Sequence, residues 1–442
     1  MTRLAAHFRA IIGPGLLLAL LSALAGCGSD PENEEGTRTV HGLSACATQI
    51  AGHLYLAALL PYEGVWTVAE PTAHAVIQAV EEINAAGGVD GRLLGLVLCN
   101  TKGDRVTAAL VMEEVARASP IAGVIGPMRY QAVESAAAVA NREEIALVAP
   151  AFGVTSVDNR WAVATAPPLP AQGVIAARIV QAKELTAAFV IASDDAASHA
   201  MRKAFIDTFA TGGDTASYIV YRHEDVDFAE TVVNGALAYG PQVVVLIGYP
   251  QEATSILQTA INRILRPNLW VFSPTLRSPD FVASVGDNAF LTRARGIGAG
   301  VPAQDDYAAF AERYQQLWGE PPEAFSAQAY DAAYLLAIAM ALSTDPDDRQ
   351  QIRDNLLRTG AGPEVHPGAW DKVLEHVPAG QVHYQGAAGP VALGTNDSAL
   401  AYFEEWTVTS AGGIESVGLV EGAAAPLVLS EKERGLGAGQ RL

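Results

Sequence analysis

Apolar positions along the chain follow two alternating patterns from residue 54 onward. Short apolar runs bounded by turn residues predict buried strands, and apolar residues spaced three and four apart predict helices. The expected strands are Leu54–Leu60, Leu93–Cys99, Ile121–Ile125 and Ala146–Val148, and the expected helices are Thr72–Ala86, Val106–Ala118 and Tyr130–Asn141. Strands that alternate with helices in this way predict a parallel sheet with helices on both faces.

The alternation begins again after a proline-rich break at 161–170. The second set of helices is Ala171–Glu184, Ala196–Ala210, Phe228–Ala238 and Gln251–Ile264, and its strands are Thr186–Ile191, Thr215–Tyr221, Val243–Ile247 and Leu269–Phe272. We therefore predict two α/β units in succession. Beyond them we expect an irregular stretch, Ser273–Pro302, with its glycine cluster 296–300 as a loop. Helices Tyr307–Trp318, Ala324–Leu342 and Pro346–Arg358 then follow, with weak strand signals at Val391–Val408.

The connection between the first helix and the second strand is the most distinctive stretch of the chain. Val76, Ala79, Val80 and Ile83 share one helical face, and the glycine pair 87–88 can adopt the left-handed conformation that ends a helix. The turn 89–92 then leads into the next strand. This arrangement is typical of a helix-to-strand connection in an α/β protein.

This stretch, Glu82–Leu94, resembles the first helix and second strand of the leucine/isoleucine/valine-binding family of periplasmic solute-binding proteins. Further segments resemble that family in order and spacing: Val124-Ile125-Gly126, Val148-Ala149-Pro150, Gln172-Gly173, Pro241–Gly248, Glu252-Ala253 and Ala329–Ala337. The resemblance implies a periplasmic binding protein of type I, in which two Rossmann-like lobes with parallel sheets are joined by a hinge. The ligand would lie in the cleft between the lobes.

In that family the second lobe is inserted into the first. The implied organisation is 53–165 plus 273–396 for lobe 1 and 166–272 plus 397–425 for lobe 2, with a frayed C-terminus at 426–442. The helix at Ala329–Ala337 is apolar almost all round, and we expect it to be buried.

The N-terminus has the pattern of an export signal, expected to span residues 1–26. Arg3 and Arg9 precede the apolar run Ile11–Leu24, which is too short and too interrupted to predict a membrane span. The sequence Leu24-Ala25-Gly26-Cys27 resembles a bacterial lipobox, which implies lipidation of Cys27; the alternative is an ordinary signal peptide with an incidental cysteine. Residues 27–52 are expected to form a disordered tether.

Cys46 and Cys99 are the other two cysteines of the chain. Exported proteins fold in an oxidising space, where such a pair tends to form a disulfide. Cys99 ends the second expected strand and Cys46 precedes the first, so parallel neighbouring strands could bring them together. We hypothesise a Cys46–Cys99 bridge; the alternative is two separate buried thiols.

Charge and motifs narrow the possible functions. The net charge of −20 argues against nucleic acid, which basic surfaces recognise. The chain has no nucleophile elbow, no zinc helix and no phosphate loop, so we expect neither an enzyme nor a cofactor. His366, His376 and His383 lack the spacing of metal ligands, and we expect no metal site.

Ligand contacts are expected in the loops that follow the strands, because parallel sheets bind ligands at their carboxyl ends. Arg129, Tyr130 and Gln131 stand where the family has a serine-rich loop that contacts a ligand carboxylate. Arg129 could hold an anion through a two-pronged contact; the alternative is that it faces solvent or pairs with an acid. Ala151 and Phe152 fall in the next loop, where Phe152 either lines a pocket or packs.

In lobe 2 the candidate ligand residues are Ser198, Tyr249 and Thr275. Asp194 and Asp195 are expected to cap a helix. Two features with which the family recognises amino acids are missing: a tyrosine-glycine pair at residues 198–199, and an acid after residue 273 that holds an α-ammonium. We therefore expect the scaffold to bind a different small molecule, such as an anionic or aromatic one.

The resemblance implies an extracytoplasmic solute-binding lipoprotein that captures an amino acid or a related compound. Hinge closure around the ligand would present it to an ABC importer. The alternative is a sensory or interaction lipoprotein on the same scaffold, without transport. The expected location is the cell envelope, exported and lipid-anchored. The expected partners are a small molecule, an ABC permease and the membrane that holds the anchor.

Overall fold

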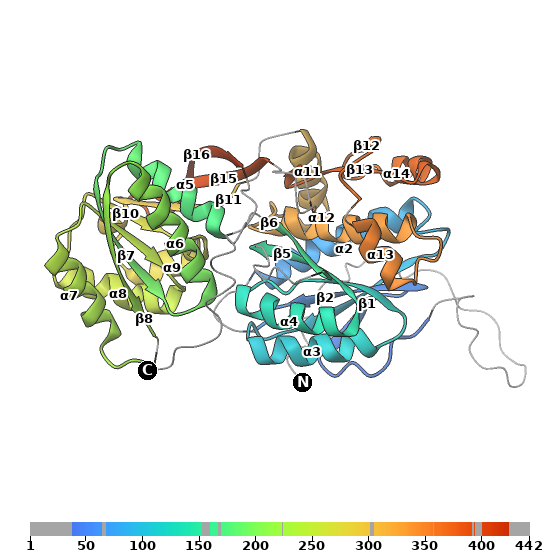
Figure 1. Cartoon of the computed structure of the whole chain (residues 1–442). Coiled ribbons are helices and arrows are strands. Elements are labelled where there is room, and N and C mark those ends of the chain that lie inside the picture. The colour runs from blue at the N-terminus through green and yellow to red at the C-terminus, as the bar shows by residue number, and fades with distance from the viewer. Residues whose placement is uncertain are drawn as a thin grey trace, which may run out of the picture. The chain divides into compact units, whose positions relative to one another are not determined.

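The computed structural model describes residues 38–63, 68–152, 160–166, 169–222, 224–300, 305–356, 358–390, 393 and 400–423. This part of the chain forms two large sheets and one small sheet with helices packed around them (Figure 1). The predicted signal peptide 1–26, Cys27 and the C-terminal residues 426–442 lie outside the described residues. We call 38–166 with 305–390 the first lobe, and 169–300 with 400–423 the second lobe.

The first sheet has six strands and lies in the first lobe. Its strands, in spatial order, are β1 (Cys46–Ile50), β3 (Leu94–Asn100), β2 (Leu54–Leu60), β4 (Ile121–Ile125), β5 (Ala146–Phe152) and β6 (Ala162–Ala166). All neighbours are parallel except β1, which runs antiparallel to β3. The sequence predicted a wholly parallel sheet, but the observed sheet is mixed because β1 is antiparallel.

Alternation along β2 shows how this sheet is covered. Leu54, Leu56 and Leu60 pack into one core with helices α2 (Ala69–Ala85) and α12 (Ser326–Ala341). The intervening residues, such as Tyr55 and Leu59, pack into a separate core with α3 (Arg105–Arg117) and α4 (Tyr130–Glu143), which lie side by side in Figure 1. Every residue of β2 is buried, which explains its continuous apolar run.

Strand β1 occupies part of the segment predicted to be a disordered tether. Cys46 lies directly opposite Cys99 in the β1–β3 pair, and their sulfur atoms are 2.01 Å apart. The hypothesised disulfide is confirmed, although it joins antiparallel rather than parallel strands. Since Arg38 also donates its backbone N–H to the carbonyl of Gly52 at 2.8 Å, the tether prediction is wrong for 38–52.

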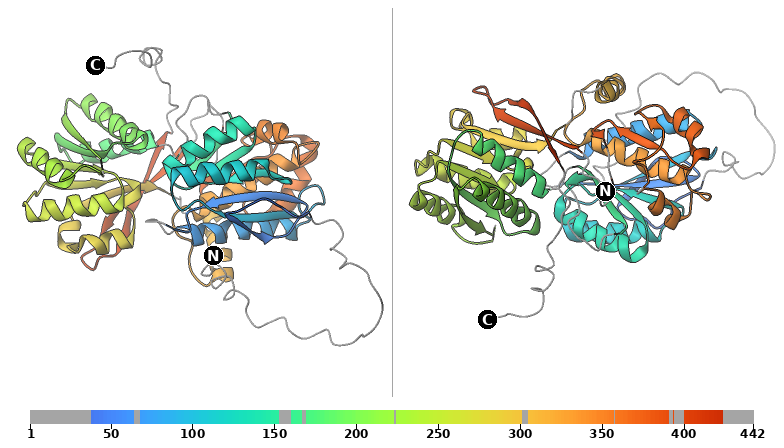
Figure 2. Two further views of the ribbon diagram at one scale, coloured as in Figure 1. Left: turned by 90° about the horizontal axis from the view of Figure 1, so that it is seen from below. Right: turned by 45° about the horizontal axis from the view of Figure 1, so that its top comes forward.

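The second sheet has seven strands and lies in the second lobe. In spatial order they are β16 (Ile414–Ala423), β15 (Leu400–Val408), β11 (Ala294–Ala299), β10 (Leu269–Phe272), β9 (Val243–Ile247), β7 (Ala187–Ser193) and β8 (Thr215–Tyr221). The strands from β8 to β11 are parallel, whereas β15 and β16 form an antiparallel hairpin at one edge (Figure 2).

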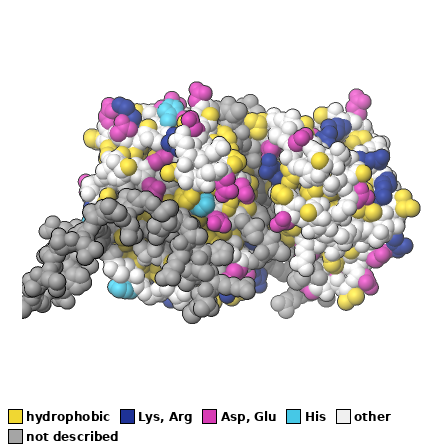
Figure 3. Space-filling model, turned by 180° about the vertical axis from the view of Figure 1, so that it is seen from behind, with side chains coloured by type: hydrophobic (Ala, Val, Ile, Leu, Met, Phe, Trp, Pro, Cys, Tyr) yellow, Lys and Arg dark blue, Asp and Glu magenta, His cyan; other side chains and the backbone are white. Residues whose placement is uncertain are grey.

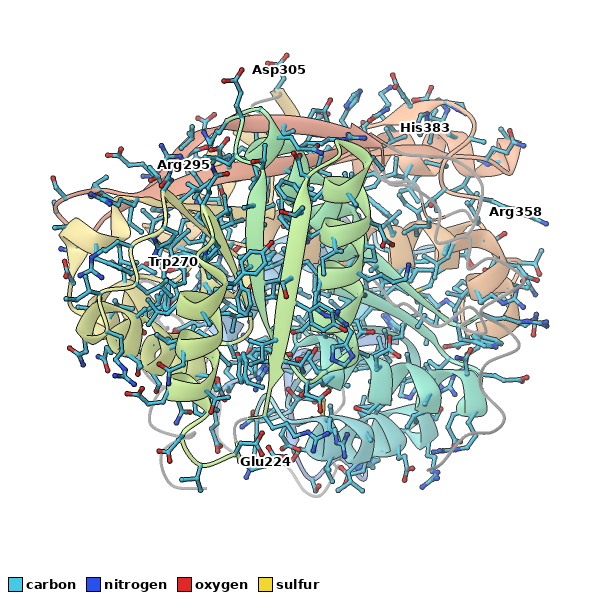
Figure 4. The ribbon with its side chains drawn as sticks, turned by 60° about the vertical axis from the view of Figure 1, so that its left-hand side comes forward. Glu224, Trp270, Arg295, Asp305, Arg358 and His383 are labelled. Atoms are coloured by element: carbon cyan, nitrogen blue, oxygen red, sulfur yellow. A yellow bond between two sulfur atoms is a disulfide. The ribbon has the colours of Figure 1, made fainter. Side chains whose placement is uncertain are left out.

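Helices cover both faces of the second sheet. Those on one face are α5 (Leu169–Gln181) and α6 (Ala196–Thr211). The other core contains α7 (Phe228–Tyr239), α8 (Pro250–Asn262), α9 (Pro279–Val285) and α10 (Asn288–Leu291). Trp270, labelled in Figure 4, is buried in this second core.

Strand β11 shows that the chain does not return to the first lobe at residue 273, as the resemblance implied. Its glycine-rich sequence suggested a loop, but it pairs with both β10 and β15. Gly296 lies opposite Trp406, and a Cβ built on Gly296 would be 1.9 Å from the indole Cε2. The glycine therefore makes room for a buried tryptophan, and the second lobe extends to residue 300.

The late helices complete the first lobe. They are α11 (Asp305–Trp318), α12, α13 (Arg349–Leu356) and α14 (Trp370–His376), and the 3-10 turn η2 (Val377–Ala379) follows α14. A second 3-10 turn, η1 (Pro274–Leu276), follows β10 in the second lobe. The small sheet consists of β12 (Glu364–Val365), β13 (His383–Gly386) and β14 (Gly389–Pro390).

Every residue of α12 is buried, as its sequence predicts, and the helix includes an acid. Asp331 accepts hydrogen bonds from the Tyr384 hydroxyl at 2.8 Å and from the backbone N–H groups of Ala387 and Ala388 at 2.7 and 2.8 Å. These bonds attach the β13–β14 turn to α12. Burial nevertheless raises the pKa of Asp331 to about 7.

Charged side chains of both signs are interspersed over the face drawn in Figure 3, and yellow apolar side chains lie between them. The hairpin edge carries several ion pairs. Arg295, labelled in Figure 4, places its Nε 3.2 Å from the carboxylate of Glu405 on β15.

Candidate functional site

A cavity of about 680 Å³, counted with its part open to solvent, lies where strand-end loops of the two lobes meet. It is lined by residues that follow β4 in the first lobe and by residues that follow β7, β9 and β10 in the second: Met128, Arg129, Tyr130, Ala197, Ser198, Met201, Ile247, Gly248, Tyr249, Pro250, Ser273, Pro274 and Thr275. In the second sheet, the carboxyl ends of β7, β9 and β10 lie at the same end as the loop after β8, which Glu224 marks in Figure 4. The carboxyl ends of parallel strands therefore build the cavity, as expected for this class of sheet.

The first-lobe wall is a tight loop between β4 and α4. Gly126 has φ of +94°, and a Cβ there would lie 2.4 Å from the carbonyl oxygen of Leu59 on β2. Only glycine fits this close passage without a shift of the backbone. The loop then delivers Met128, Arg129 and Tyr130 to the cavity.

Arg129 stands at the N-cap of α4 and reaches toward the second lobe. Its Nη1 donates to the carbonyl of Gly103 at 2.9 Å, and its guanidinium carbon lies 5.0 Å from the ring centre of Tyr249. Among the described residues, no carboxylate lies within ion-pair distance of Arg129. The cation is thus held by a backbone carbonyl and an aromatic face.

Tyr249 is the second-lobe partner in that contact and is the N-cap of α8. Burial, supported by the negative charge of Asp195, raises the pKa of its hydroxyl, and nearby Arg129 opposes this rise. Tyr249 is therefore neutral at physiological pH. It offers the cavity a ring face and a hydroxyl.

The serine and threonine hydroxyls of the cavity are engaged by their own lobe. Thr275 donates its hydroxyl to the carbonyl of Gly248, and Ser273 lies 3.3 Å from the same carbonyl. Ser198 donates its hydroxyl to Asp195 at 2.9 Å. These three side chains brace the loops that form the wall.

Three helix N-termini face this region, and they differ in their caps. Asp195 caps α6 by accepting the N–H of Ser198, whereas no side chain caps α4 or α8. Asp194 does not cap; it pairs with Arg222 at 2.6 Å, and that hydrogen bond holds the pKa of its carboxyl below the usual value. The uncapped ends of α4 and α8 leave N–H donors and a partial positive charge near the cavity.

Five of the predicted ligand residues line the cavity: Arg129, Tyr130, Ser198, Tyr249 and Thr275. Gln131 is exposed and is not in the lining, and Ala151 is buried in the core behind β5. Phe152 ends β5, but its side chain lies outside the described residues. The structure therefore does not bring Gln131 or Ala151 to the cavity.

The lining residues that the sequence did not reveal are mostly apolar. Met128, Met201, Ile247, Pro250 and Pro274 have the character of core residues, so no chemical pattern distinguishes them. Met201 was not identified from the sequence. It lies one helical turn after Ala197 on α6, and that spacing is the only signal from which it could have been identified.

In the described part of the chain, no group of three or more His, Cys, Asp or Glu side chains is arranged to hold a metal ion. His366 pairs with Asp306 at 3.0 Å. None of the described helices has the length and apolar character needed to cross a bilayer.

Comparison with known proteins shows which family has this architecture. A family model described as periplasmic binding protein matches residues 54–398. The chemotactic signal transduction system substrate-binding protein BasB of Halobacterium salinarum is 25% identical over 355 residues, which cover 76% of this chain and 82% of that protein.

Two solved structures share the fold. The leucine-binding protein LivK of Thermotoga maritima superposes with a TM-score of 0.70 at 18% identity, covering 83% of this chain and 98% of that one. The branched-chain amino acid substrate-binding protein LivJ of Streptococcus pneumoniae, solved in complex with isoleucine, gives 0.67 at 20% identity and covers 84% and 99%. The predicted two-lobed α/β fold is thus confirmed, and the chain belongs to the periplasmic binding protein family.

Proposed function

We propose that this protein is an extracytoplasmic receptor that captures a small solute between its lobes for an ABC importer. The observation that carries the proposal is the cavity itself. Its walls come from the strand ends of both sheets, so a ligand there contacts both lobes at once. Such a ligand favours the closed arrangement over the open one and shifts the population toward it.

Two relatives support a solute-binding role. LivJ was solved with isoleucine, and BasB is named as a substrate-binding protein. We also infer that the protein acts by binding without catalysis. In the described lining, Arg129 is held by the carbonyl of Gly103 and the ring of Tyr249, which supply neither a nucleophile nor a base.

A second candidate function is sensory, and BasB is the observation that favours it, because that relative belongs to a chemotactic signalling system. In that case the closed form would be recognised by a membrane receptor rather than by a permease. Affinity purification from native membranes separates the two functions, since a permease subunit or a receptor would be recovered with the ligand-loaded protein.

Isothermal titration against amino acids, small carboxylates and short amides tests ligand capture. We expect saturable binding by at least one compound. The Tyr249→Ala variant should weaken it, because this side chain lines the cavity. Tyr218→Ala is the matched control: Tyr218 is 52% exposed on β8 and is not in the lining. Flat heats for the whole panel with folded protein would refute solute capture.

We propose further that Cys27 carries a lipid that anchors the protein to a membrane. The supporting observation is the run Leu24-Ala25-Gly26-Cys27 after an apolar segment. Mass spectrometry of the membrane fraction should find an acylated N-terminal cysteine. The Cys27→Ser variant should move to the soluble fraction, and an unmodified cysteine in membrane-bound protein would contradict the proposal.

A further inference from the structure

The charges around the cavity define what kind of ligand it can accept. Among its described lining residues, Arg129 is the one side chain charged at neutral pH, and no carboxylate is included. The uncapped N-termini of α4 and α8 begin at Arg129 and Tyr249, so both helix dipoles add positive potential in the same place. A ligand that brings a negative charge is favoured by all three groups.

Arg129 is arranged to receive that charge. A guanidinium carries five N–H donors in a planar fork, and Nη1 of Arg129 uses one of them on the carbonyl of Gly103 at 2.9 Å. The ring of Tyr249 covers its face and leaves the edge of the fork for a planar acceptor. A carboxylate matches that edge through two parallel hydrogen bonds.

The described lining offers no comparable binding partner to an ammonium group of a ligand. It needs about three hydrogen-bond acceptors and a counter-charge if it is to leave water. The carbonyl of Gly248, which faces this region, already accepts from Ser273 and Thr275. The Ser198 hydroxyl donates to Oδ2 of Asp195, whose Oδ1 accepts the backbone N–H of Ser198 at the start of α6.

Two carboxylates near the cavity, Asp195 and Glu252, compete with this view. Burial raises the pKa of the Tyr221 and Tyr249 hydroxyls, and the charges of both carboxylates raise it further. Asp195 is engaged by Ser198, but Glu252, in the first turn of α8, has a buried Oε2 without a hydrogen-bond partner among the described residues. Glu252 does not line the cavity. It is therefore the residue to test as a hidden ammonium acceptor.

The rest of the wall is apolar. Met128, Met201, Ile247 and Pro274 surround the space, and the thioethers can adapt to ring or branched aliphatic surfaces. We infer that the ligand is a monocarboxylate with an apolar or aromatic body and no ammonium group. This inference rests on the proposed function and names the substrate class of the same cavity.

Two matched sets of compounds test it by titration calorimetry on the full-length protein. The first is 4-methylpentanoate, leucine and 3-methylbutylamine; the second is 3-phenylpropanoate, phenylalanine and 2-phenylethylamine. Each set keeps one body and changes only the charged groups. We expect a carboxylate to bind about tenfold or more tightly than its amino acid, and the amines not to bind.

Variants connect this preference to the residues. Arg129→Gln should weaken carboxylate binding about tenfold or more, and Arg129→Lys, which keeps the charge without the fork, should weaken it less. Arg105→Gln is the matched control, because Arg105 is exposed at the start of α3 and does not line the cavity. Glu252→Gln should leave carboxylate affinity unchanged or improve it. Circular dichroism verifies that each variant folds.

The outcomes separate the two proposals. Tighter binding of leucine or phenylalanine than of the matched carboxylate would overturn the inference and leave solute capture standing. Loss of amino-acid binding in Glu252→Gln would do the same and would identify that residue as the ammonium acceptor. Binding of an amine alone, or carboxylate binding that is indifferent to Arg129, would also overturn it. If no compound in this set or the broader panel binds the folded protein, the proposed function itself fails.

Discussion

Replacing Gly296 by alanine should destabilise the second lobe, because a rigid tryptophan fills the space that a methyl group needs. An ideal Cβ at Gly296 would lie 1.9 Å from Cε2 and 2.0 Å from Cζ2 of Trp406. Carbon atoms in contact normally lie about 3.5 Å apart. Relief of the clash therefore requires a relative displacement of about 1.5 Å.

Neither partner can move easily. Gly296 and Trp406 are direct register partners in the β11–β15 pair, so their backbones are held by the same ladder. Trp406 is fully buried, and its ring packs 6.2 Å from that of Phe272. Overpacking of a well-packed core costs about 1–3 kcal/mol, and we expect Gly296→Ala to lie at the upper end, about 3 kcal/mol.

Urea unfolding followed by circular dichroism measures the change as a lower midpoint at unchanged slope. Gly298→Ala on the same strand is the control, because the nearest atom to its Cβ would be 3.7 Å away. We expect that variant to stay within about 0.5 kcal/mol of the parent. Combining Gly296→Ala with Trp406→Leu should cost clearly less than the sum of the single changes. Equal stability of the Gly296 and Gly298 variants, or strict additivity in the double variant, would refute the steric argument.

Two further predictions concern the first lobe. Replacing Cys46 and Cys99 with alanine opens a loop with a sequence separation of 53 residues, and the chain-entropy relation gives a loss of about 4 kcal/mol in the free energy of unfolding. Urea unfolding of the double variant measures this loss, and a midpoint equal to that of the parent would contradict it. Asp331→Asn places an amide NH₂ against the N–H of Ala388 and should cost about 1–3 kcal/mol. Because burial raises the folded-state pKa of Asp331 to about 7, its carboxyl contributes stability that is fully present below the unfolded value of 3.8 and is lost as pH rises toward 7. The parent should therefore lose stability relative to the asparagine variant across that range in urea titrations at stepped pH, and a constant difference would rule out the shifted pKa.

Strands buried on both faces were predicted accurately from the sequence. The observed bounds of β2, β4, β9 and β10 coincide with the predicted ones. In β4, β9 and β10 every residue is buried, so nothing interrupts the apolar run.

Strands β1 and β16, which the sequence missed, lie at sheet edges, whereas β11, also missed, lies inside the second sheet. Residues 414–420 of β16 are largely exposed, and β1 has three exposed residues among five. Neither has the continuous apolar pattern that marks an interior strand. Strand β11 has glycines that read as a loop until Trp406 is placed against them.

The candidate site shows the same division. Arg129 and Tyr249 were found because charged and aromatic residues at strand ends suggest ligand contacts. Ser198 and Thr275 were found too, but the structure shows their hydroxyls bound to Asp195 and to Gly248. The apolar walls could not be predicted, since Met128 and Met201 have the same character as core residues.

By itself the sequence determined the alternation of buried strands and helices, the two successive α/β units and the residue types at the strand ends. These depend on local periodicity and on turn chemistry, which adjacent residues define. Only the tertiary structure decided which strands close each sheet, which hydroxyls are already engaged, and that Arg129 of one lobe faces Tyr249 of the other. Those facts depend on contacts between residues far apart in the chain, and local sequence patterns do not specify which distant residues come into contact.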